Sequence, residues 1–394
     1  MADSAGTPGR VIVAFIVGQI GLHGAMAGLR MAAPLHALRD GYSAWAVGLL
    51  MALFAAAPVV LALHAGRLAD RFGYHRPVRI AVALAGSGAL IAVASTFALG
   101  RLQFVMLCGA AMLAGSGANM GMLTIQRTAG LAARDSTERV RIFSWLAIAP
   151  SLSGVVGPVL VGFAIDWAGF GPAYAVLLLL PLATLAAARV VPPSVPPGAG
   201  ERTRAGWDLL ASPGMKRLLV VNWLLSTCWD VHAFAVPILG HERGFAASTI
   251  GLVLGTFTLS VTGVRVFIPM LAHRLREGQV VRGAMLGTGI VFSLYPFAGT
   301  PWLMGGCAVL LGMTLGCVQP MIMSTLHHLT PEHRHGEALA FRSMAINASS
   351  TVMPLLFGAV GTVIGAAVLF WAVGGAVGAG SWMARRLDAA PARG

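Results

Sequence analysis

A few ionisable side chains lie in the middle of long apolar stretches, and they are the residues of this sequence best placed to do chemistry. Asp230 is the one carboxylate among them. A buried carboxyl group near a cation can be set to load and release a proton, so we predict proton coupling at Asp230. Histidine titrates near neutrality, which makes His23 and His232 the other candidates. The alternative is a permanent ion pair of Asp230 with Arg30 or Arg265.

Uncharged polar residues share helical faces with these groups. In one stretch three polar residues recur at i, i+4 and i+11, and in another two are seven residues apart, so each set lies on one face of a helix. Such faces suit either a bound solute or polar contacts between helices. The predicted substrate-binding residues are Gln19, His23, Arg30, Asn119, Gln126, Arg265 and Asn347.

Arg265 favours a particular kind of solute. It follows Thr258 and Thr262 on one helical face and has no acidic residue in its own apolar stretch. A guanidinium beside hydroxyl groups suits a carboxylate, phosphate or sulfonate. With Arg30 it would make a binding cavity positive, so an anionic or zwitterionic solute is at least as well favoured as a lipophilic cation.

The elements that hold these residues are membrane-spanning helices. Hydrophobic residues make up 57% of the 394 residues and charged residues only 10%, well below the charged share of a soluble domain. A helix needs about 20 apolar residues to cross the hydrocarbon layer. The sequence therefore predicts an all-α integral membrane protein with twelve transmembrane helices, at 11–35, 43–65, 78–99, 103–126, 141–164, 170–189, 217–239, 247–271, 280–298, 302–325, 338–360 and 364–384.

Positive charge sets the orientation of these spans. The stretch 66–79, GRLADRFGYHRPVR, has four arginines against the single acid Asp70 and is predicted to be a tight loop. Basic residues favour the cytoplasmic side. Most of the 27 lysines and arginines fall in the N-terminus, the even-numbered loops or the C-terminus. We therefore predict a multi-pass protein of the cytoplasmic (inner) membrane with both termini in the cytoplasm.

The chain also repeats itself. A shift of 203 residues aligns GYSAWAVGLL (41–50) with GFAASTIGLV (244–253), and Pro34 with Pro237. Residues 190–216 are rich in proline, glycine and charge. We predict two six-helix bundles, 1–189 and 217–394, joined by a cytoplasmic linker at 190–216, with the binding site between the halves.

Two motifs resemble those of a known family. The charged loop is similar to the loop between the second and third spans of the major facilitator superfamily, through Gly66, Asp70, Arg71, Gly73 and Arg76. The fifth span contains Gly157, Pro158 and Gly162, which resemble the antiporter motif of the drug-exporting branch. The resemblance implies that both motifs control conformational change. From the residues alone, a topology-setting basic loop and a helix-packing seam remain as alternatives.

Other classes of function are less well supported. The formal charge of +13 is spread over alternate loops, whereas nucleic-acid binding needs a basic stripe on one solvated face. Cys108, Cys228, Cys307 and Cys317 lie in apolar runs without ligand spacing. The histidines of the loop 327–337 lack a helical i, i+4 pair of two histidines, so we expect no metal and no cofactor. We find no constellation typical of a membrane enzyme.

These observations predict a secondary active transporter. We expect alternating access and proton-coupled efflux of a small amphipathic or anionic solute, with an organic-anion importer or exchanger as the alternative. Its expected partners are the solute, protons and the lipid bilayer, and we expect a monomer.

Overall fold

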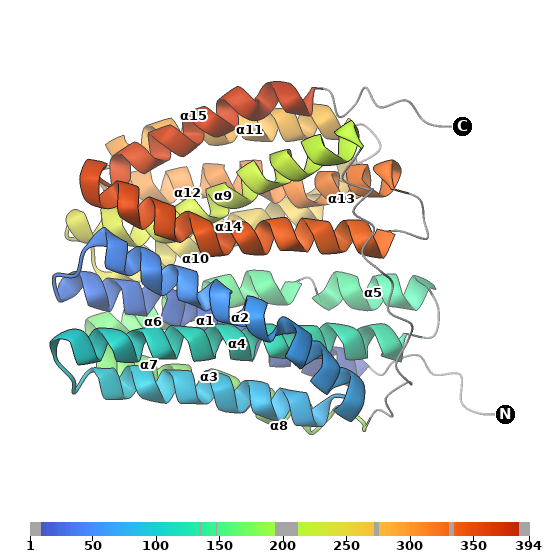
Figure 1. Cartoon of the computed structure of the whole chain (residues 1–394), viewed down its shortest axis with the longest axis horizontal. Coiled ribbons are helices and arrows are strands. Elements are labelled where there is room, and N and C mark those ends of the chain that lie inside the picture. The colour runs from blue at the N-terminus through green and yellow to red at the C-terminus, as the bar shows by residue number, and fades with distance from the viewer. Residues whose placement is uncertain are drawn as a thin grey trace. The chain divides into compact units, whose positions relative to one another are not determined.

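The computed structural model (Figure 1) describes residues 9–133, 136–146, 148–193, 212–271, 276–330 and 335–385. Within these ranges the regular structure is helical throughout. The helices are α1 (Gly9–Arg39), α2 (Ala44–Phe72), α3 (His75–Ser95), α4 (Gly100–Ala132), α5 (Ser136–Leu146), α6 (Ile148–Ala168), α7 (Phe170–Leu177), α8 (Leu179–Ala188), α9 (Pro213–Glu242), α10 (Ala247–Leu271), α11 (Glu277–Leu294), η3 (Tyr295–Phe297), α12 (Pro301–Gly316), α13 (Val318–Leu329), α14 (His335–Ile364) and α15 (Ala366–Ala384).

The twelve predicted spans are confirmed. In the described part of the chain, twelve helical segments are long and apolar enough to cross a membrane, and each overlaps one predicted range. A helix satisfies its backbone hydrogen bonds internally, which is why it can lie in hydrocarbon. Of the predicted linker, residues 194–211 lie outside the described residues.

Two predicted spans are each divided into two helices. The first helix of each pair ends at Leu177 or Gly316. Each of these residues stands four positions before a proline, namely Pro181 and Pro320. Proline has no N–H to donate to the carbonyl four residues earlier, so the helix loses one hydrogen bond at that point. These prolines account for both breaks.

The predicted loop 66–79 is largely helical, and that expectation was wrong. α2 continues to Phe72 and α3 begins at His75, so the turn consists of Gly73 and Tyr74. Gly73 has φ +66°, a conformation that glycine adopts without strain. The guanidinium of Arg76 lies 4.0 Å from the ring centre of Phe72. Arginine therefore packs on the last turn of α2 and does not interrupt it.

The chain forms two compact units. Unit 1 comprises 1–42, 49–201 and 246–255, and unit 2 comprises 43–48, 202–245 and 256–394. In unit 1, α1 packs against α6 and α3 against α4. In unit 2, α9 packs against α14 and α11 against α15. The first turns of α2 and α10 thus belong to the other unit from the rest of their helices.

Glycine makes these first turns fit closely. In unit 2, a Cβ atom on Gly48 of α2 would lie 2.3 Å from the carbonyl oxygen of Pro354 in α14. In unit 1, a Cβ atom on Gly251 of α10 would lie 2.4 Å from the carbonyl oxygen of Pro158 in α6. Only glycine allows such an approach of two backbones. The same glycine-on-proline contact is made once in each unit.

Candidate transport site

Asp230 is held in the interior of unit 2. It lies in α9 with 4% of its surface exposed. Ser349 and Ser350 of α14 donate hydrogen bonds to its two carboxylate oxygens, over 2.8 and 3.1 Å. Ser226, one turn earlier in α9, donates to the Asn222 carbonyl. Serine hydroxyl groups therefore satisfy both carboxylate oxygens of Asp230 in a buried position.

His232 is occupied by aromatic partners. Its Nε2 atom lies 2.9 Å from the hydroxyl oxygen of Tyr295, and its ring centre lies 4.2 Å from that of Phe257. Only 2% of its surface is exposed. These contacts join α9, α10 and η3, so His232 has a packing role in unit 2 whether or not it also carries a proton.

Two arginines of unit 2 are anchored by amide side chains. Arg265 of α10 donates from Nη2 to the Gln319 amide oxygen of α13, at 2.7 Å. Arg342 of α14 donates from Nε to the Asn222 amide oxygen of α9, at 3.2 Å. The hydroxyl of Thr262 donates to its own helix, at the Thr258 carbonyl.

Of these four residues, the sequence prediction named only Arg265 as a substrate contact. The signal for Asn222 was available, since an amide in an apolar stretch needs a partner. Its partner Arg342 is 120 residues away in the chain. Hydropathy does not reveal such a pairing.

In unit 1, the polar face of α1 contains groups without partners. Gln19 has 1% of its surface exposed, and neither its amide oxygen nor its amide nitrogen has a hydrogen-bond partner in the described structure. The Nδ1 atom of His23 and the buried hydroxyl of Tyr74 are also unsatisfied. Buried polar groups are normally paired, so these are candidate contacts for a solute or for water.

The other predicted substrate contacts differ in exposure. Arg30, Asn119 and Gln126 are part-buried in unit 1. Asn347 is exposed in unit 2, and its backbone carbonyl accepts a hydrogen bond from Thr351. Their role in binding stays a prediction.

A buried polar cluster in unit 1 was missed. The Nδ1 atom of His36 lies 3.2 Å from the hydroxyl oxygen of Tyr174, and its Nε2 atom lies 2.9 Å from the amide nitrogen of Gln103. Gln103 also donates to the Asp40 carboxylate at 2.7 Å. The i, i+4 spacing of His36 and Asp40 was readable from the sequence. The cluster ties α1 to α4 and α7.

The predicted switch residues fall into two groups. Side-chain contacts of Gly66 and Asp70 lie outside what the structure describes, and Arg71 and Arg76 are exposed beside Phe72. Gly157, Pro158 and Gly162 are buried in α6. They form close contacts with neighbouring helices. Their role in conformational change stays a prediction.

The end of α6 is also tied to α10. The carboxylate of Asp166 accepts hydrogen bonds from the backbone N–H groups of Ala247 and Ser248, at 2.9 and 2.7 Å. These are N–H groups at the beginning of a helix, where no partner exists within the helix itself and a negative charge is favoured.

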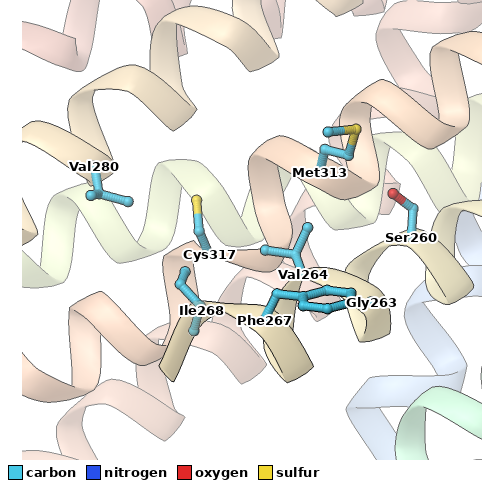
Figure 2. Close-up of a pocket in the computed structure, with 8 residues that line it drawn as sticks. All are labelled: Ser260, Gly263, Val264, Phe267, Ile268, Val280, Met313 and Cys317. Carbon is cyan, nitrogen blue, oxygen red and sulfur yellow. The ribbon is translucent and has the colours of Figure 1, made fainter. Parts of the chain in front are cut away.

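An apolar groove lies on unit 2. It has a volume of about 480 Å³ and is lined by Ser260, Gly263, Val264, Phe267, Ile268, Val280, Met313 and Cys317 (Figure 2). The Ser260 hydroxyl already donates to the Val309 carbonyl. Phe267 is 63% exposed and Met313 is 53% exposed. This groove suits a lipid tail better than a charged solute.

Comparison with known proteins assigns the fold and the kind of activity. The family model described as Major Facilitator Superfamily matches residues 15–228 and 218–394. The tetracycline resistance protein, class B, of Escherichia coli is 23% identical over 325 residues, covering 79% of this chain and 77% of that protein. The enterobactin exporter EntS of Escherichia coli O1:K1 / APEC is 26% identical over 319 residues, covering 77% of this chain and 74% of the exporter.

Solved structures agree on the fold. A POT family transporter in complex with a thioalcohol-conjugated peptide has a TM-score of 0.78 at 11% identity, covering 95% of each chain. A bacterial homologue of the iron transporter ferroportin, in its inward-facing state, has a TM-score of 0.75 at 15% identity, covering 98% of this chain and 100% of that one. These relatives and neighbours are transporters rather than enzymes.

Proposed function

Because the chain belongs to the Major Facilitator Superfamily, in its drug-exporter-like branch, we propose that it is a proton-coupled exporter of a small amphipathic or anionic solute. It is a multi-pass transporter of the inner membrane. The names of its relatives, a tetracycline resistance protein and an enterobactin exporter, support the outward direction.

The observation that carries the coupling is Asp230 in its setting of two serines. As a carboxylate, it accepts from Ser349 and Ser350 and holds α9 to α14. As a carboxylic acid, Asp230 has one O–H group that donates a hydrogen bond in place of accepting one. The two serine hydroxyls then have fewer acceptor sites, and the contact between α9 and α14 weakens. Protonation then favours one arrangement of α9 and α14, and release of the proton favours the other. If the solute binds only one of these two arrangements of α9 and α14, the protein exchanges a proton for the solute.

Transport in membrane vesicles tests this proposal. Everted vesicles, which take up what the cell exports, are energised to an acidic interior and then given tetracycline, enterobactin or benzoate as probes. We expect an exported probe to accumulate inside and to dissipate part of the pH gradient. Accumulation that persists after the gradient is collapsed would overturn proton coupling. Accumulation only in right-side-out vesicles would favour the organic-anion importer.

The orientation is tested by cysteine labelling. We propose that both termini and residues 190–216 are cytoplasmic, since basic residues favour that side. We expect Ser194→Cys to resist an impermeant maleimide in intact cells and to react after permeabilisation. The matched control is Gly299→Cys, at an exposed position on the opposite side, where an added Cβ atom meets only Phe297 O at 4.0 Å. Labelling of Ser194→Cys in intact cells would contradict the topology.

A further inference from the structure

Two hydrogen-bonded pairs of unit 2, Arg342–Asn222 and Arg265–Gln319, involve four helices. Asn222 lies nine residues after the beginning of α9 and Arg342 seven residues after that of α14, which is about 14 and 10 Å at the helical rise. Arg265 lies six residues before the end of α10 and Gln319 ten before the end of α13, about 9 and 15 Å. All four therefore lie at a similar depth, nearer the end that we propose to be cytoplasmic.

The charge of this group is not balanced by the protein around it. Arg265 and Arg342 are both cationic, and α13, which holds the Arg265 partner Gln319, packs against α9 and α14, which hold Asn222 and Arg342. Their hydrogen-bond acceptors are the neutral amides of Gln319 and Asn222. No carboxylate of the described residues lies within ion-pair distance of either guanidinium. Two like charges in a partly buried site cost free energy unless an anion is brought to them.

Unused donors point to the same ligand. The amide nitrogen of Asn222 and the Nε atom of Arg265 are buried and have no hydrogen-bond partner. Asn222 itself is 4% exposed. Its amide oxygen already accepts a hydrogen bond from Arg342, so the atom without a partner is the amide nitrogen, which is a donor. Both unsatisfied atoms are thus donors in a positively charged site, and an oxyanion is the group that accepts from donors and neutralises the charge.

We propose that Arg265, Arg342 and Asn222 bind the oxyanion group of the transported solute, a carboxylate, sulfonate or phosphonate, and that Gln319 positions the Arg265 fork. This assignment rests on the proposed transport function and narrows its solute to organic anions. A neutral amide of the same shape would leave the two positive charges uncompensated and so binds weakly. The planar forks of the two arginines match two-pronged contacts to such a group.

Binding to the purified full chain in detergent tests the site without any gradient. The probes are benzoate, benzenesulfonate and phenylphosphonate, with neutral benzamide as the matched probe, followed by calorimetry and by the shift in thermal unfolding. We expect at least one anion to bind, and Arg342→Gln and Arg265→Gln each to weaken it tenfold or more. The control Arg276→Gln, an exposed cation before α11, should leave binding unchanged.

Asn222→Asp gives the sharpest test. It places a carboxylate beside Arg342, so it should raise the thermal unfolding midpoint and abolish anion binding together, a result that misfolding cannot mimic. Equal binding of benzamide and benzoate, or unchanged binding in both Gln variants, would overturn the site. If anions bind as expected but vesicles show no coupled export, the proposed function fails and the site stands. If the vesicles show coupled export but the Arg265→Gln and Arg342→Gln variants bind the anions unchanged, the proposed function stands and the site fails.

Discussion

Asp230→Asn is expected to abolish accumulation of solute against its gradient while leaving exchange across the membrane intact. An asparagine has nearly the same shape, can accept from one serine and donate to the other, and so should keep α9 and α14 together. It cannot load a proton. We expect pH-driven uptake into reconstituted vesicles to fall to the level of vesicles without a gradient, while counterflow of labelled solute continues.

The control for this variant is Glu242→Gln. Glu242 lies at the end of the same helix, is exposed, and should tolerate the change with accumulation preserved. Full pH-driven accumulation by Asp230→Asn would show that the proton is carried elsewhere, and His23→Gln and His232→Gln would then be the next variants to measure. Loss of both accumulation and counterflow would show a structural role in its place.

Gly157→Val is expected to destabilise the protein severely. A Cβ atom at Gly157 of α6 would lie 2.3 Å from the carbonyl oxygen of Gly24 and 2.7 Å from the amide nitrogen of Gly28, both in α1. These are backbone atoms, which cannot turn aside as a side chain does. Overpacking ordinarily costs about 1–3 kcal/mol, and we expect at least the upper end of that range here. The yield of monodisperse protein and its thermal unfolding midpoint should both fall.

Gly109→Val in α4 is the matched control, because nothing lies within 4 Å of an added Cβ atom there. It introduces the same β-branched residue into a helix of unit 1, so any cost of helix propensity is shared. An unfolding midpoint equal in the two variants would contradict the proposed contact between α1 and α6.

The spans were predictable because a bilayer imposes one simple requirement. A stretch of about 20 apolar residues is needed whatever its neighbours are. The burial of Asp230 followed from the same reasoning, since a charged group within the hydrocarbon layer needs polar partners. The identity of those partners could not be predicted. Ser349 and Ser350 lie 119 and 120 residues away from Asp230, and no local pattern links them to it.

The loop after α2 shows where composition misled. Charge and glycine together indicated a turn over 66–79, yet arginine is a good helix former, and seven of those residues continue α2. The breaks in α7–α8 and α12–α13 lie four residues before a proline, where the helix loses a hydrogen bond, whereas Pro34 and Pro237 lie inside unbroken helices. Hydropathy alone predicts one continuous span for each of these helix pairs.

The spacing of the glycines with positive φ indicates that the chain arose by duplication of a shorter one. Gly41 and Gly244 adopt left-handed turns 203 residues apart, and Gly169 and Gly365 do so 196 residues apart. A duplicated gene leaves such pairs behind, because a backbone turn that only glycine makes without strain is harder to alter than the side chains between. The difference between the two spacings implies that the second copy is seven residues shorter than the first between these turns. One ancestral six-helix gene, doubled and then changed in length by seven residues in one copy, accounts for both.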